Sequence, residues 1–171
     1  MAAIDLIVLG MLKKEALSAY DIQKLVEYRN ISKWVKISTP SIYKKVIQLE
    51  EKGFITSTTV QGENLADKAV YSLTAAGEKE MERLSLGISS EPIHIFLDFN
   101  AVIVNLSNLT PENRRICLEN IERNIDALTE YLEENLDTKE RLPEIPETGM
   151  AVLRQQLILA RAVKGWISEM N

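Results

Sequence analysis

The feature that most constrains this chain is a short segment with clear ends, residues 39–53. Thr39 is a good N-cap because its hydroxyl can accept a hydrogen bond from a free backbone N–H, and Pro40 falls at the first helical position, where its missing donor has no cost. Gly53 lies where a left-handed C-terminal cap would end the helix. Apolar residues repeat at helical spacing and predict one buried stripe: Ile42, Val46 and Leu49. The chain is therefore expected to fold around one short, firmly bounded helix.

The opposite face of this predicted helix is polar and has no acidic residue. Its members are Ser41, Tyr43, Lys44, Lys45 and Gln48. Gln can pair with adenine through two hydrogen bonds and Ser can bond in either direction, so Gln48 and Ser41 are the candidate base contacts. The lysines, the tyrosine hydroxyl and Thr39 are candidates for contacts to phosphate, although a solvated helix face is the simpler interpretation of lysines.

The charge of the chain is distributed unevenly. The net charge of −5 argues against nucleic-acid binding, but residues 1–85 hold 12 Lys and Arg against 11 Asp and Glu, whereas residues 86–171 hold 8 against 14. Residues 28–49 have no acid and five basic residues: Arg29, Lys33, Lys36, Lys44 and Lys45. Because the Debye length is about 8 Å at physiological salt, a phosphate responds to this local patch more than to distant acids. DNA binding is therefore compatible with the acidic total.

Composition and rare residues exclude several classes of protein. A content of 46% apolar residues in 171 is sufficient for a globular protein of one or two domains. There is no run of about 18 apolar residues and no basic leader before the apolar start, so we expect a soluble cytoplasmic protein. Cys117 is the only cysteine, which excludes an internal disulfide. His94 is the only histidine and has no nucleophile pattern nearby, so we expect no enzyme, no catalytic residue, no cofactor and no metal.

The elements around the short helix follow the order of a winged helix-turn-helix. Residues 4–12 predict a first amphipathic helix, and a second runs from the N-cap Ser18 to about Tyr28, so that three helices precede the first strand. Residues 54–60 and 69–73 predict the two strands of a hairpin, and Thr74 begins a fourth helix. In a winged helix-turn-helix the third helix enters the major groove and the hairpin contacts the flanking backbone. Asn64 and Lys68 in the predicted turn are candidates for that contact, or plain turn residues.

The second half of the chain predicts a separate helical domain. Residues 87–92 are small, polar and end in proline, which indicates a boundary between a winged helix-turn-helix at 1–86 and an all-α domain at 92–171. Residues 93–106 fit either a strand or a buried helix. Thr110 and Pro111 begin a long helix, and a last helix runs from Met150 to about Met170. The fold class is thus mainly α with a small β-hairpin.

The apolar faces of these last two helices are wider than a small domain can bury, so a partner subunit is expected. The predicted interface residues are Ile4, Leu118, Ile121, Ile125, Leu128, Leu132, Leu159, Val163 and Trp166. Aromatic residues Phe96, Phe99 and Trp166 are candidates for a pocket that binds a flat aromatic effector, although packing in the core or the dimer is the simpler interpretation.

Five segments resemble motifs of the PadR family of transcriptional regulators, in the family's order. They are Ile7–Leu12 (IVLGML), Ser18–Ile22 (SAYDI), Ser41–Tyr43 (SIY), Leu49–Ile55 (LEEKGFI) and Tyr71–Gly77 (YSLTAAG). The resemblance implies a homodimeric regulator, commonly a repressor, that binds a palindromic operator in double-stranded DNA and is released by a small molecule. Pro40 and Lys44 depart from the family pattern, where Gly and Pro are usual. The alternatives are another regulator family with a similar wing and a winged-helix module that binds protein instead of DNA.

Overall fold

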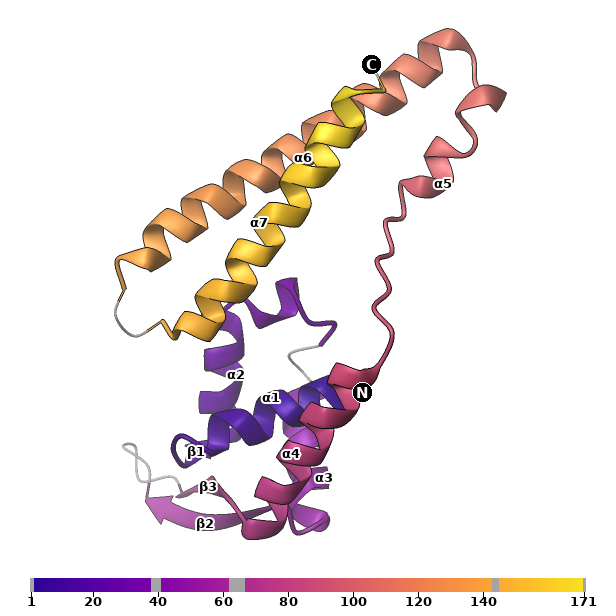
Figure 1. Ribbon diagram of the computed structural model, residues 1–171. Helices are drawn as coiled ribbons and strands as arrows, with labels where there is room; N and C mark the ends of the chain where they lie inside the picture. The colour runs from indigo at the N-terminus through magenta and orange to yellow at the C-terminus, as the bar shows by residue number, and fades with distance from the viewer. Residues whose placement is uncertain (1, 38–40, 62–66, 143–144, 171) are drawn as a thin grey trace. The chain divides into compact units, whose positions relative to one another are not determined.

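The computed structural model describes residues 2–37, 41–61, 67–142 and 145–170. Its internal contacts divide the chain into two compact units, Met1–Ile93 and His94–Asn171 (Figure 1). Among the described residues, no helix is both long enough and apolar enough to cross a membrane.

The first unit begins with the two helices that the sequence predicted. Helix α1 spans Ala2–Leu12 and helix α2 spans Ala19–Tyr28. The predicted N-cap of α2 is confirmed, because the Asp21 N–H donates to Ser18 Oγ at 3.2 Å and the Ser18 N–H donates to Asp21 Oδ2 at 3.1 Å. The apolar sides of both helices lie in the core of the unit, where Val8, Leu9 and Ile22 are completely buried.

Helix α3, Ser41–Glu51, is the element that positions the candidate site. Its predicted stripe is buried, with Ile42, Val46 and Leu49 at most 1% exposed. The predicted left-handed cap is confirmed, since Gly53 has φ +73° and the Phe54 N–H donates to the Leu49 carbonyl at 3.0 Å. Thr39 and Pro40 lie outside the described residues, so the N-terminal cap stays a prediction.

The hairpin of the first unit is confirmed and belongs to a three-stranded antiparallel sheet of order β1-β3-β2. Strand β2 (Ile55–Gln61) pairs with β3 (Asp67–Leu73). Strand β1 (Leu17–Ser18) pairs with the other edge of β3. The expectation that three helices precede the first strand was wrong, because two residues are too few to show the alternation by which a strand is detected.

Helix α4 (Ala75–Ser90) closes the first unit. Its predicted start is confirmed, because Thr74 Oγ1 accepts a hydrogen bond from the Gly77 N–H at 3.0 Å and donates to the Gly53 carbonyl at 2.7 Å. A Cβ atom at Gly77 would lie 2.0 Å from the Phe54 carbonyl oxygen, so only glycine allows this approach. The helix continues to Ser90, and most of the boundary segment predicted at 87–92 is therefore helical.

The second unit consists of short helices followed by two long ones. Residues 92–97 have no regular secondary structure and are followed by α5 (Asn100–Ile103) and a 3-10 turn, η2 (Leu106–Asn108). Residues 93–106 therefore form neither a strand nor a single buried helix, and only the short α5 within them is α-helical, with no buried residue. The two long helices are α6 (Pro111–Glu140) and α7 (Glu147–Ser168).

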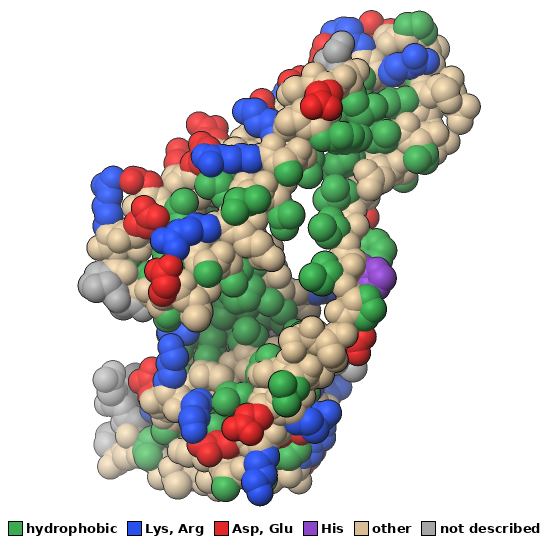
Figure 2. Space-filling model, in the orientation of Figure 1, with side chains coloured by type: hydrophobic (Ala, Val, Ile, Leu, Met, Phe, Trp, Pro, Cys, Tyr) green, Lys and Arg blue, Asp and Glu red, His purple; other side chains and the backbone are tan. Residues whose placement is uncertain are grey.

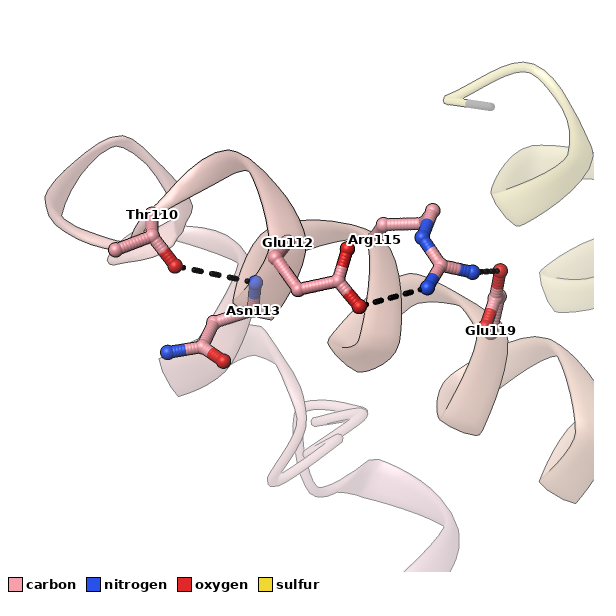
Figure 3. Close-up of polar contacts among 5 residues, drawn as sticks. All are labelled: Thr110, Glu112, Asn113, Arg115 and Glu119. Carbon is pink, nitrogen blue, oxygen red and sulfur yellow. Dashed lines mark hydrogen bonds and ion pairs between the residues drawn. The ribbon is translucent and has the colours of Figure 1, made fainter.

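The predicted start of α6 is confirmed by its hydrogen bonds (Figure 3). Thr110 Oγ1 accepts from the Asn113 N–H at 3.3 Å. Arg115 lies between two acids of the same helix face, donating to Glu112 at 2.8 Å and also to Glu119. Such exposed pairs within one helix stabilise it by roughly a few tenths of a kcal/mol each, so they favour the formation of α6.

Helices α6 and α7 pack against each other as an antiparallel pair. Ion pairs join them at 2.8 Å between Asp126 and Lys164 and at 2.7 Å between Glu133 and Arg161. The residue later in α6, Glu133, pairs with the residue earlier in α7, Arg161, so the two helices are antiparallel. The buried residues between the helices are Leu118, Ile125, Leu132, Leu153, Leu157, Ala160 and Ile167.

Candidate nucleic-acid interface

The outward face of α3 is the centre of the candidate interface. Helical spacing places Lys44, Ile47, Gln48 and Glu51 on the side away from the buried stripe. Lys44 and Glu51 are exposed, Gln48 is half-buried, and Ile47 is 53% exposed. Tyr43 lies on the flank of the helix and is 45% exposed. The prediction of a polar, acid-free face was incomplete, because Ile47 lies at its centre and Glu51 lies at its C-terminal end.

Lys45 has a different role from the one predicted. Its Nζ lies 2.8 Å from Asp5 Oδ1 on α1, and the two side chains are only 12% and 16% exposed. Separating a largely buried ion pair leaves an uncompensated charge, which is strongly unfavourable. Lys45 therefore joins α3 to α1 and is not a cation available to phosphate.

Gln48 lies between the outward face and a shallow groove of the first unit. The charged residues that line this groove come from α1, α3 and α4: Asp5, Lys45, Glu51, Lys52, Glu80 and Arg83. Three are basic and three acidic, so the groove has no net charge with which to attract an anion. Arg83 also donates to Glu80 at 2.7 Å, which lowers the pKa of Glu80 and keeps this acid ionised. The groove therefore does not extend a phosphate-binding surface, and the candidate interface is the outward face of α3 and its neighbours.

The basic segment before α3 is anchored to the core of the unit. The 3-10 turn η1 (Ile31–Lys33) follows Asn30, whose φ of 53° is left-handed, and Ile31 is only 3% exposed. This anchor leaves Lys33 and Lys36 exposed, as candidate phosphate contacts should be. The structure therefore places two cations directly before the described start of α3.

Helix α2 contributes exposed residues that the sequence analysis did not select. Tyr20 is 57% exposed and Lys24 Nζ lies 5.4 Å from the centre of its ring. Lys24 also lies 3.0 Å from Glu27, and a hydrogen bond to that acid raises the pKa of Lys24. In helix-turn-helix proteins the helix before the recognition helix crosses the DNA backbone, so Tyr20 and Lys24 join the candidate contacts. Their spacing of four residues on the polar side of α2 was the signal available in the sequence.

The wing is the β2–β3 hairpin, and its candidate residue Lys68 lies on β3 opposite Val60. Lys68 Nζ is 3.7 Å from Asp21 Oδ2, so it also connects the wing to the start of α2. The pKa of Asp21 is lowered chiefly by the hydrogen bond from the Ser18 side chain and to a smaller extent by Lys68. Asn64 lies outside the described residues and stays a prediction.

The candidate effector residues of the second unit are only partly brought together. The rings of Phe99 and Trp166 stack with centroids 6.0 Å apart. Phe96 is 84% exposed and stacks instead on His94, with centroids 5.8 Å apart. Figure 2 shows hydrophobic side chains gathered on the visible face of this unit near the C-terminal end of α7.

The predicted interface residues divide into two sets. Four of them are buried within the single chain, each at most 8% exposed, and so have little surface to offer a partner: Ile4, Leu118, Ile125 and Leu132. The others remain accessible, with Leu128 at 46%, Leu159 at 44% and Trp166 at 38% exposure, and Ile121 and Val163 half-buried. Apolar residues at helical spacing do not show whether they pack within the chain or between chains. In this structure α7 covers most of the apolar stripe of α6.

Comparison with known families identifies the first unit. Residues 8–83 match the family model described as the transcriptional regulator PadR-like family. The match covers α2, α3 and the wing, so the candidate interface lies within the matched region.

A curated relative supports the same assignment. The negative transcriptional regulator PadR of Bacillus subtilis strain 168 is 34% identical over 82 residues. The aligned region is 47% of this chain and 44% of that protein, so this similarity spans less than half the length of the relative.

Solved structures of PadR-like proteins show the same fold over nearly the whole chain. Bacillus subtilis PadR in complex with operator DNA matches with a TM-score of 0.82 at 22% identity, covering 98% of this chain and 96% of that one. The PadR-like transcriptional regulator BC1756 from Bacillus cereus matches with a TM-score of 0.73 at 19% identity, covering 98% and 94%. Bacillus subtilis PadR in complex with p-coumaric acid matches with a TM-score of 0.78 at 20% identity, covering 98% and 92%. The winged-helix fold and the mainly α architecture are thereby confirmed.

Proposed function

We propose that this chain is a DNA-binding transcriptional regulator, a repressor that acts in the cytoplasm and binds a palindromic operator as a homodimer. The observation on which this rests is the outward face of α3, where the exposed Lys44 and the half-buried Gln48 lie on a short helix with a fully buried opposite side. Exposed Lys33 and Lys36 precede the helix. A two-fold dimer would present two such helices about 34 Å apart, one turn of DNA.

The relatives support the operator and the effector as parts of this proposal. The curated relative is a negative regulator, and Bacillus subtilis PadR has been solved with operator DNA and with p-coumaric acid. The stacked pair Phe99 and Trp166 is the described feature that suits a small aromatic effector. The proposal contains no catalytic activity, because it rests on cations and hydrogen-bond donors placed to bind DNA.

The test is DNA binding by Lys44→Glu, with Lys79→Glu on α4 as the control of equal charge change. We expect Lys44→Glu to weaken binding to all sequences by at least about tenfold, since a phosphate contact carries no sequence information. The slope of log affinity against log salt concentration should fall by roughly 1.8 for the two contacts of a dimer. Lys79→Glu should leave both quantities close to the values of the unmodified protein.

The rival function is a winged-helix module that binds protein, for which the exposed Ile47 and Tyr43 are also suitable. A gel shift with DNA from upstream of the chain's own gene, at low salt, distinguishes the two. Absence of a shift there and with a random genomic library, or binding that does not respond to salt, would count against the regulator and for the rival.

A further inference from the structure

The outward face of α3 includes one large apolar side chain that no DNA-binding role has yet explained. Ile47 is 53% exposed, whereas the other isoleucine of this helix, Ile42, is completely buried. A single exposed apolar residue is common on protein surfaces and by itself indicates nothing. The position of Ile47 is what distinguishes it.

Ile47 lies beside Lys44, one of the residues of α3 best suited to contact DNA. Lys44 precedes it by three positions, one turn along the same side of the helix. Gln48 follows Ile47 directly and points about 100° away from it, on the other flank of the outward face. A helix that enters the major groove brings such residues toward the edges of neighbouring base pairs, which are about 3.4 Å apart. The face is therefore apolar beside Lys44, at a point where contact with bases is expected.

The major groove presents one apolar group that can complement this side chain. Thymine carries a 5-methyl group there, whereas cytosine has only a hydrogen at that carbon and the nitrogen and oxygen groups of the bases are hydrogen-bond donors or acceptors. Isoleucine is β-branched and strongly restricted at χ1 in a helix, so little side-chain freedom remains to be lost on contact. An apolar side chain placed against a donor or acceptor would leave that group without a partner, which is unfavourable.

We propose that Ile47 contacts the 5-methyl group of one thymine in each half-site and thereby selects thymine at that position. The inference rests on the proposed function, because it requires α3 to enter the major groove. It adds a residue that determines specificity and acts through shape and apolar contact, beside the hydrogen bonds expected from Gln48.

Replacement of thymine by deoxyuridine tests the contact, since it removes only the methyl group. The full chain is first used to select its site from a random pool of duplex DNA, and each thymine of the selected site is then replaced in turn. At one thymine per half-site we expect the affinity of the unmodified protein to fall about fourfold, the value of one buried methyl group. Ile47→Ala should bind the thymine and deoxyuridine duplexes equally at that position.

Two further variants make the outcome decisive. Ile88→Ala truncates an isoleucine of α4 that is 38% exposed, and it should keep the response of the unmodified protein to deoxyuridine. Ile47→Gln keeps a long side chain on the helix surface and should lose the response in the same way as Ile47→Ala, while circular dichroism checks that both are folded.

The failures of the two proposals are distinguishable. If the chain selects a DNA sequence but Ile47→Ala and Ile47→Gln respond to deoxyuridine like the unmodified protein at every thymine, the contact is refuted and the regulator stands. The same holds if the selected site contains no thymine shared by both halves. If no DNA sequence is enriched, the regulator itself is refuted and the contact with it.

Discussion

The two units of this chain differ in how completely they bury their apolar residues. In the first unit, helices α1 to α4 and the sheet enclose a core with several completely buried side chains, among them Val8, Ile22, Ile42 and Val46. Among the described residues of the second unit, only Ile167 is buried to that degree, and the other core residues keep 3% to 8% exposure. Apolar residues on the outside of α6 and α7 are far more exposed: Ile116, Leu128, Tyr131, Ile158, Leu159 and Trp166.

This difference follows from the number of layers. A helix buries only the stripe that another element covers, and an antiparallel pair covers one stripe on each helix. The first unit supplies covering elements on several sides, whereas α6 and α7 have mainly each other. The first unit therefore has the buried core of a domain that folds on its own. The second unit leaves apolar surface exposed, as expected of a surface that packs against a partner.

The largest expected effect tests how closely the first unit is packed. Gly77→Ala would place a Cβ atom 2.0 Å from the Phe54 carbonyl oxygen and 2.7 Å from Leu73 Cδ1. Because the first of these neighbours is backbone, α4 would have to move away from the hairpin, and we expect a loss of about 3 kcal/mol or more in the free energy of unfolding. Urea denaturation followed by circular dichroism measures it.

Gly10→Ala is the matched control for that experiment. Gly10 also lies in a helix of the first unit, but a Cβ atom there meets nothing within 4 Å. Alanine is the better helix former, so the free energy of unfolding of this variant should rise by about 0.5 to 1 kcal/mol. Equal effects of the two substitutions would show that the contact of Gly77 with Phe54 does not limit the packing of this unit.

The next largest effect concerns the open face of the second unit. Leu159 is 44% exposed, so Leu159→Lys should leave the fold of the single chain unchanged. If this residue lies in the centre of a dimer interface, burying the ammonium group should raise the dimer dissociation constant by roughly 30-fold, or about 2 kcal/mol. Sedimentation equilibrium measures the dissociation constant directly.

Ile158→Lys provides a control one residue away. Ile158 is 66% exposed but points about 100° around α7 from Leu159, toward a different side of the helix. We expect it to leave dimerisation unaffected. A dimer broken by Ile158→Lys and not by Leu159→Lys would assign the interface to the opposite flank, and a monomer before any substitution would refute the homodimer.

Local signals in the sequence predicted most of the first unit. The caps at Ser18, Gly53 and Thr74 were all recognisable because each depends on a few adjacent residues, and so was the cap at Thr110 in the second unit. The hairpin was recognisable from its composition. Two-residue β1 was missed because it depends on pairing with β3, which is distant in sequence. The continuation of α4 to Ser90 was also missed, and packing does not explain it, because residues 85–90 are all exposed.

The candidate site was less predictable than the fold. Helical periodicity correctly assigned Lys44 to the outer side of α3, but it could not show that Lys45, one position further, meets Asp5 of α1. The stripe of α6 was also visible in the sequence, yet its partner was not, because α7 of the same chain and a helix of another subunit offer the same apolar surface. Which element covers a face is decided by tertiary structure, and periodicity only shows that a face needs covering.

The smallest predicted effect compares one carboxylate from each unit. Asp21 accepts hydrogen bonds from the Ser18 backbone at 3.1 Å and from the Ser18 hydroxyl at 2.7 Å, and these lower its pKa below the ordinary 3.8. A group whose pKa is lowered by folding stabilises the folded state above its unfolded pKa, and the contribution disappears as the pH falls through the folded pKa. We therefore expect Asp21→Asn to cost about 1 kcal/mol at pH 7 and progressively less below pH 3.8.

Asp126→Asn is the counterpart in the second unit. Asp126 pairs with Lys164 at 2.8 Å, but both side chains are 48% exposed, and exposed ion pairs contribute roughly 0 to 1 kcal/mol. Urea denaturation of both variants at pH 7 and at acid pH should therefore give a pH-dependent loss for Asp21→Asn that exceeds the loss for Asp126→Asn. If the two losses are equal at pH 7, the capping box is no stronger than a surface pair, and the first unit differs from the second in its apolar core and not in its capping hydrogen bonds.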